Sequence, residues 1–210
     1  MRCLLAVAAF CLSLAPVVGA AEDTGNWRRL VTTGELVEVT RMDPSFVVEL
    51  RYATTRNGAN TALYPPDFPC LLRPSVARKL LAAQRSLRVD GLGLKVWDAY
   101  RPAGAQRALW QRIGQRRYVA DPDAGGGSVH TRGAAVDVTL VDLANGRERP
   151  MPTDFDGFSL DAVGIYRGPD ASVRESLRRL HRAMVDAGFL AQYWEWWHFT
   201  DRDWRRHGPL

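Results

Sequence analysis

The sequence predicts a single α+β domain whose central sheet is mostly antiparallel and flanked by helices. Apolar residues recur with helical spacing around residues 74–90 and 169–188, a further helix is expected from about Pro102 to Ile113, and strand-like segments alternate irregularly with these helices. Some gaps between segments are of hairpin length, which favours antiparallel pairing. The chain has 210 residues, 46% of them hydrophobic and 24% charged, as expected for one globular core rather than a disordered or fibrous chain.

The first segment, residues 1–20, has the features of a secretory signal peptide. Arg2 gives it a positive start, residues 4–14 are almost wholly apolar, and small residues precede Ala20. The apolar run is too short to span a bilayer comfortably. We expect cleavage near Ala20, a secreted or periplasmic location without stable membrane insertion, and a folded domain over residues 21–210; a buried N-terminal helix is the alternative.

Cysteine content and charge distribution argue against a disulfide-stabilised protein and against a nucleic-acid-binding protein. Cys70 is the one cysteine outside the predicted signal peptide, so no internal disulfide is expected, and we interpret it as a buried structural thiol. The formal net charge is +5, which raises the question of nucleic-acid binding. The arginines, however, are scattered and interleaved with acidic residues, so we predict no nucleic-acid partner.

Four segments are predicted as strands. They are residues 46–52, 92–98 and 134–141, followed by the aromatic segment 193–199 as a final core strand. Residues 54–69 contain three prolines and an Asn-Gly pair, so they are predicted to form a long loop. Loops of this length are usually functional.

The first candidate site pair is His130 and Asp137, at the start of one predicted strand. An odd separation would point the two side chains to opposite faces of a regular strand. A turn ending at Gly133 can change the alternation of side chains between the two faces of the strand, so that both side chains face one ion. The alternative is a solvent-facing histidine beside a strand-edge aspartate. Two further histidines, His181 and His207, are interpreted as surface residues.

The second pair is Glu195 and His198, which lie among aromatic residues. Residues three apart share a face on a helix but not on a regular strand, so a bend or bulge is required here. Burying these polar groups would be costly unless they are paired or bind a metal. Zinc accepts this mixture of nitrogen and carboxylate ligands and leaves one position open in catalytic sites. The alternative is an aromatic core strand with a salt-bridged glutamate.

The third candidate is Arg101, at the end of a predicted strand and directly before Pro102. An arginine in this place can aim its guanidinium into a cleft and stabilise negative charge that develops on a reacting carbonyl oxygen. The alternative is a surface arginine paired with Asp98.

Together these segments resemble the zinc D-alanyl-D-alanine dipeptidases of VanX type, within the D,D-peptidases related to the Hedgehog fold. The family pattern S-x-H-x-x-G-x-A-x-D is matched by Ser128, His130, Gly133, Ala135 and Asp137. The elements E-x-W-H and Tyr-Arg-Pro are matched by Glu195, Trp197 and His198 and by Tyr100, Arg101 and Pro102. The resemblance spans roughly residues 35–200 and includes the segments around Tyr52 and Asp156.

The resemblance implies one zinc ion per chain and a role for each matching residue. The implied ligands are His130, Asp137 and His198. Glu195 would be the general base, and Arg101 would stabilise the tetrahedral intermediate.

Three more residues are implied to contact the substrate. Asp156 would receive the free ammonium, and Ser128 and Tyr52 would line the site. One departure concerns residues 55–60, which lack the phenylalanine that family members usually carry there. This departure leaves the width of the substrate pocket open.

The expected activity is hydrolysis of D-alanyl-D-alanine, a small dipeptide, to two D-alanines in cell-wall salvage or turnover. Three alternatives remain at this point. They are a zinc carboxypeptidase acting on peptidoglycan peptides, a non-catalytic zinc-bearing cell-wall binding module, and a metal-free basic envelope-binding protein. The oligomeric state is not predicted.

Overall fold

The computed structural model describes residues 26–124 and 126–210, so the predicted signal peptide lies outside the described residues. The helices are α2 (Trp27–Thr32), α3 (Val39–Met42), α4 (Pro74–Arg88), α5 (Ala103–Ile113) and α6 (Ala171–Asp186). The strands are β1 (Val37–Glu38), β2 (Val47–Val48), β3 (Leu71–Leu72), β4 (Leu92–Asp98), β5 (Ala135–Asp142), β6 (Phe189–Ala191) and β7 (His198–Asp201). Short 3₁₀ turns are η2 (Arg51–Ala53), η3 (His130–Arg132), η4 (Leu160–Ala162) and η5 (Trp204–Arg206). Among the described helices, none has the length and apolarity needed to cross a membrane.

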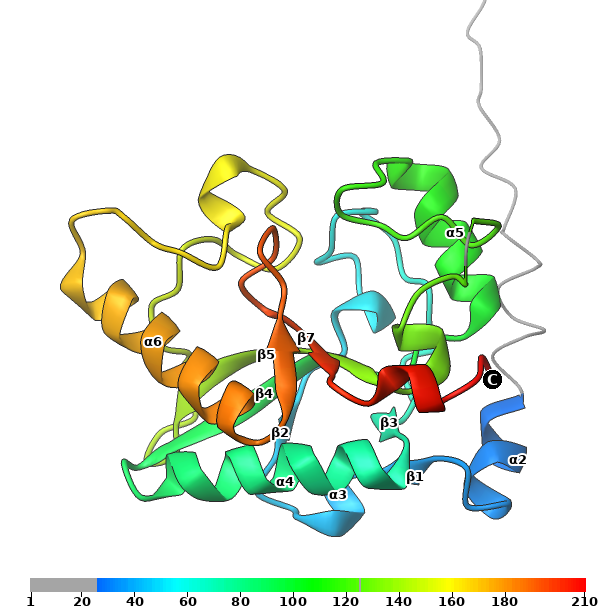
Figure 1. Cartoon of the computed structure of the whole chain (residues 1–210), viewed down its shortest axis with the longest axis horizontal. Coiled ribbons are helices and arrows are strands. Elements are labelled where there is room, and N and C mark those ends of the chain that lie inside the picture. Colours follow the sequence, from blue (N-terminus) through cyan, green and yellow to red (C-terminus); the bar gives the residue numbers. More distant parts are fainter. Residues whose placement is uncertain (1–25, 125) are drawn as a thin grey trace, which may run out of the picture.

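The central sheet has the order β2-β4-β5-β7-β6. Strand β2 runs parallel to β4, and the other neighbouring pairs are antiparallel. A separate small sheet pairs β1 with β3. Helices α4 and α6 pack against each other and against the sheet, and α5 lies apart from them across the molecule (Figure 1). These observations confirm the predicted α+β fold with a mostly antiparallel sheet.

The three predicted helices lie within about two residues of their predicted bounds, whereas the short helices α2 and α3 were not predicted. Pro74 occupies the first turn of α4, where a missing backbone N–H has no cost. The side chain of Asp170 caps α6 by accepting hydrogen bonds from the backbone N–H groups of Ser172 and Val173. Helix α5 ends at Gly114, which has a left-handed φ of +60°.

The predicted strand over residues 46–52 is wrong beyond its first residues. Pairing with β4 covers only Val47–Val48, and the chain then turns into η2. Within this turn Arg51 is buried, with its guanidinium 5.1 Å from the centre of the Trp97 ring. Tertiary contacts of Arg51 and Tyr52 with the core therefore outweigh the strand propensity of the segment.

The aromatic segment 193–199 is also not a continuous strand. Residues before His198 form the connection between β6 and β7, which pair as a hairpin. The backbone N–H of Trp196 donates to the carbonyl of Ala162, and His198 N–H donates to the carbonyl of Glu195. The bend that the Glu195–His198 spacing requires is therefore present, and it lies in the hairpin connection.

Two histidines interpreted as surface residues are half-buried instead. The His181 Nε2 atom lies 3.2 Å from the Trp196 carbonyl oxygen, so α6 supports the hairpin connection. The Nε2 atom of His207 lies 3.6 Å from a carboxylate oxygen of buried Asp201. The prediction for Cys70 is confirmed, because its thiol is buried and burial raises its pKa above the ordinary value.

Candidate active site

A row of polar side chains crosses three adjacent strands of the sheet. Asp98 is paired with Asp137 in the register of β4 and β5, and Asp137 is paired with His198 in the register of β5 and β7. Directly opposite residues in antiparallel strands point to the same face of the sheet. A register shift between Val96 and Asp98 brings Asp98 into this row. The sheet therefore places three functional groups side by side.

His130 joins this row from η3, which precedes β5. The turn ends at Gly133, whose φ is +65°. A Cβ atom at this glycine would also lie 2.7 Å from the Leu36 Cδ2 atom, so both backbone and space require glycine. The turn resets the phase between His130 and Asp137, as the sequence predicts.

The donor atoms of His130, Asp137 and His198 lie within 4.8 Å of one another and can hold a metal ion. His130 Nε2 is 3.1 Å from His198 Nδ1, which is 2.9 Å from an Asp137 carboxylate oxygen. Burial raises the pKa of the Asp137 carboxyl, but the interactions with His130 and His198 together outweigh this effect and hold it below the usual value. Asp137 is therefore ionised at neutral pH.

The outward-facing ring nitrogens of both histidines have hydrogen-bond partners. His130 Nδ1 lies 2.7 Å from the Ala99 carbonyl oxygen, which can only accept, so this nitrogen carries the hydrogen. His198 Nε2 lies 3.1 Å from the Thr200 hydroxyl and is assigned as its donor. Each ring then turns a lone pair inward, beside the carboxylate. Three electron-rich atoms at such short separations fit a bound cation.

Glu195 lies at the edge of this cluster and is buried, with 8% of its surface exposed. Burial raises its pKa well above the ordinary value, and the negative charges of Asp137 and Asp156 add to this effect. A carboxyl group whose pKa is raised holds a proton more readily, so it can both accept and return one. This is the property required of a general base.

Arg101 is buried and held in one orientation. Its Nη2 and Nε atoms lie 2.6 and 3.0 Å from one oxygen of Asp98, and its Nη1 atom donates to Gln106 over 2.8 Å. Its guanidinium carbon also lies 4.6 Å from the centre of the Tyr52 ring. Arg101 is therefore paired with Asp98, but it is buried and lines a pocket and is not at the surface.

Asp156 lies at the other end of the pocket. One of its carboxylate oxygens accepts hydrogen bonds from the Tyr52 hydroxyl, over 3.0 Å, and from the Gly58 backbone N–H, over 2.9 Å. Burial raises the pKa of this carboxyl to about 7. Its backbone φ is +55°, which is costly for a residue with a side chain and often marks a functional position.

We expect replacement of Asp156 by asparagine to stabilise the folded protein at pH 8. Because the pKa of this acid is raised in the folded state, its ionisation costs folding free energy progressively from about pH 4 to about pH 7, and fully above pH 7. Asparagine removes this cost, at most about 4 kcal/mol. It can still accept both hydrogen bonds and tolerates a positive φ.

The measurement is thermal denaturation of the metal-free wild type and of the D156N variant, at pH 8 and at pH 4. The melting temperature should rise in the variant at pH 8 and change little at pH 4. An equal shift at both pH values would show that ionisation of Asp156 is not the cause.

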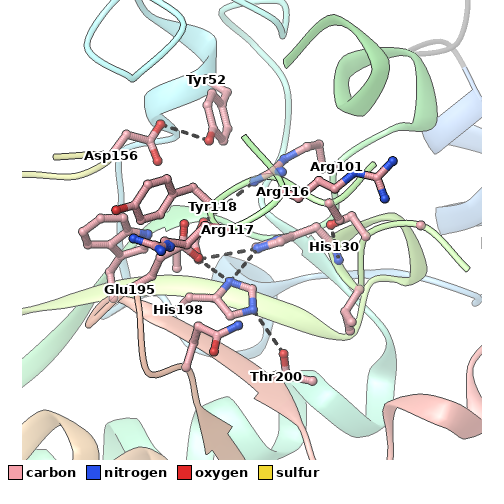
Figure 2. Close-up of a pocket in the computed structure, with 17 residues that line it drawn as sticks. Tyr52, Arg101, Arg116, Arg117, Tyr118, His130, Asp156, Glu195, His198 and Thr200 are labelled. Carbon is pink, nitrogen blue, oxygen red and sulfur yellow. Dashed lines mark hydrogen bonds and ion pairs between the residues drawn. The ribbon is translucent and has the colours of Figure 1, made fainter. Parts of the chain in front are cut away.

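The pocket that these residues line has a volume of about 210 Å³. This is below the range of roughly 300–1,000 Å³ that is typical of drug-sized ligands, so the pocket suits a small substrate. Figure 2 shows Tyr52 and Asp156 at one end and His130, His198 and Thr200 at the other. Ser128 also lines the pocket, and its hydroxyl accepts the backbone N–H of His130. The structure thus brings together every predicted site residue.

Several supporting groups escaped sequence reasoning. The Ala99 carbonyl and the Thr200 hydroxyl orient the two histidines, and Gln106 holds Arg101. Backbone carbonyls leave no sequence signal, whereas the Asp98–Arg101 spacing could have indicated a buried pair. Arg117 and Tyr118 also line the pocket, from a segment without a recognisable pattern.

The site can hold a metal ion, as the site of a metallopeptidase does. The family model of the D-ala-D-ala dipeptidases, within the peptidase M15 family, matches residues 32–205. The chain therefore belongs to the D-ala-D-ala dipeptidase family, and it is an enzyme of that class.

Named relatives agree with this assignment. A D-alanyl-D-alanine dipeptidase of Escherichia coli (strain K12) is 33% identical over 167 residues, which cover 80% of this chain and 84% of the relative. A protein of the same name from Enterococcus faecium is 30% identical over 144 residues, covering 61% and 71% of the two chains. Another, from Enterococcus faecalis (strain ATCC 700802 / V583), is 26% identical over 141 residues, covering 60% and 70%.

Proposed function

We propose that this protein hydrolyses D-alanyl-D-alanine to two D-alanines and holds one zinc ion for this purpose. The proposal rests on the inward-facing set of His130, Asp137 and His198, with Glu195 and Arg101 beside it. Two imidazoles, one carboxylate and an open position form the donor set typical of catalytic zinc. When bound, zinc supplies Lewis-acid polarisation of a carbonyl group and makes water more acidic.

Glu195 and Arg101 have separate roles at the scissile bond. Glu195 removes a proton from the attacking water and returns it to the leaving amine, and its raised pKa suits both transfers. The guanidinium of Arg101 stabilises the negative charge that develops on the carbonyl oxygen. Because Asp98 and Gln106 hold this guanidinium in place, little reorganisation is needed during the reaction.

Asp156 selects the amino end of the substrate. A buried carboxylate that is costly to ionise alone is well suited to pair with an ammonium group, since the pair compensates the burial of both charges. The Tyr52 hydroxyl and the Gly58 N–H hold the carboxylate in position. A free dipeptide places its ammonium close to the scissile bond, which fits a pocket with Asp156 at one end.

The test of this proposal is turnover of D-alanyl-D-alanine by the purified protein with zinc, with a chelator, and with zinc restored. Chelation should abolish turnover, and zinc should restore it. Zinc should also stabilise the fold, by about 2.7 kcal/mol at one hundred times its dissociation constant.

A His198→Ala variant is the matched control, and it should lose both the turnover and the stabilisation by zinc. If zinc binds but neither the dipeptide nor longer peptides that end in D-alanine are cleaved, the binding-module alternative replaces this proposal. Turnover that persists in the chelator would exclude the metal mechanism.

We further propose that the enzyme acts outside the cytosol, in salvage or turnover of cell-wall D-alanine. The support is the signal-peptide pattern of residues 1–20. An exported enzyme cannot deplete a cytosolic dipeptide pool, so precursor removal does not fit. Finding the uncleaved protein in the cytosol would overturn this part of the proposal.

A further inference from the structure

Behind the amino end of the pocket lies a second hollow, a groove of about 650 Å³. It is lined by residues of the 55–60 segment and by Asp154, Phe155, Asp156 and Phe158. Asp156 lines both the pocket and the groove. The two spaces are therefore separated by a thin layer of side chains around this carboxylate.

The layer is built from two stacked aromatic rings. Tyr118 lines the pocket and Phe158 lines the groove. Their ring centres lie 4.6 Å apart, with 21° between the ring planes. Tyr118 lines the same pocket as Asp156 and Glu195, and all three are labelled in Figure 2.

Both rings have support from neighbouring segments. The centre of the Phe158 ring lies 6.5 Å from that of Trp197, and a Cβ atom at Gly58 would lie 2.7 Å from Phe158 Cε2. Next to Tyr118, the guanidinium of Arg117 lies 4.5 Å from the centre of the Trp194 ring, so the segment that carries Tyr118 is tied to the hairpin connection. These contacts hold the rings between the two spaces.

Gly58, in the segment of residues 55–60, lies directly against the Phe158 ring. The absence of a side chain at Gly58 leaves room for the Phe158 ring, which comes from a segment about one hundred residues away. The aromatic group beside the pocket is thus supplied from another part of the chain.

We propose that the stacked pair Tyr118–Phe158 determines the length of the substrate by closing the pocket at the amino end. This inference rests on the proposed function, in which Asp156 receives the substrate ammonium. A third residue attached to the amino end would have to pass through the two rings to reach the groove. The pair therefore admits a dipeptide and excludes a tripeptide, and its removal joins the pocket to the groove.

The experiment compares kcat/KM for D-Ala-D-Ala and for the tripeptide L-Lys-D-Ala-D-Ala in the zinc-loaded full chain. Tyr118→Ala and Phe158→Ala should each raise the tripeptide-to-dipeptide ratio by about tenfold or more, mainly through a lower KM for the tripeptide. Tyr118→Phe keeps the ring stack and should keep the ratio of the wild type. Leu160→Ala, on the same segment as Phe158 but 75% exposed, is the matched control.

Calorimetric titration of the metal-free proteins with the tripeptide gives a second readout that does not depend on turnover. Binding should be absent in the wild type and present in both alanine variants. An unchanged ratio and unchanged tripeptide binding in both variants, with a wild type active on the dipeptide, would overturn the role of the pair. A wild type inactive on the dipeptide would instead overturn the proposed function on which the pair depends.

Discussion

Replacing Glu195 by glutamine is expected to lower kcat for D-Ala-D-Ala by about 10²–10⁴-fold. Glutamine has nearly the shape of glutamate but cannot take a proton from water, so the loss measures proton transfer alone. The side chain is buried, and its raised pKa reflects a site that favours the uncharged form. Folding should therefore tolerate the amide.

Three measurements accompany this variant. Zinc stoichiometry should remain at one per chain, because Glu195 is not among the proposed ligands. The melting temperature at pH 8 should not fall, because the variant removes a buried ionisable group. A variant that binds zinc normally and keeps the wild-type kcat would show that another group is the base.

Replacing Arg101 by methionine is expected to reduce kcat by about 10²–10³-fold and to destabilise the fold by about 3–5 kcal/mol. The first effect is the loss of charge stabilisation at the carbonyl oxygen. The second arises because Asp98, which is fully buried, loses its charged partner. One substitution thus combines a catalytic and a structural loss.

A second variant separates the two losses. Adding Asp98→Asn to Arg101→Met removes the unpaired charge, and the asparagine oxygen can still accept the hydrogen bond from Tyr64. The double variant should regain most of the stability but none of the kcat. Recovery of kcat together with stability would mean that Arg101 acts only through the fold.

The sequence predicted most of the secondary structure, but not its interruptions. The sequence pattern located α4, α5, α6, β4 and β5, because in these elements the local pattern and the burial agree. It failed over residues 46–52 and 193–199, where strand-forming residues turn out of the sheet. In both segments the turn is held by contacts with distant parts of the chain, such as the hydrogen bond from the Trp196 backbone N–H to the Ala162 carbonyl. No local pattern records such contacts.

The residues of the candidate site could be predicted from the sequence, whereas the walls of the pocket around them could not. Residue types and spacing indicated His130, Asp137, Glu195 and His198, and the need for a bend in each half of the site was visible from parity alone. The arrangement of the pocket walls was not predictable. Phe158 comes to lie beside residues 55–60 only through the fold, and the exposed ends of loops follow no periodicity.

The row of Asp98, Asp137 and His198 forms only when the central strands pair in the correct register. A slip of one residue between β5 and β7 would send His198 to the opposite face, so only correctly aligned strands place His198 beside Asp137. His130, Asp137 and His198 come from segments far apart in the sequence, so no early fragment of the fold offers the full donor set. In the proposed metal-bound protein, binding of the ion should therefore come last in folding, and release of the ion should precede separation of the central strands.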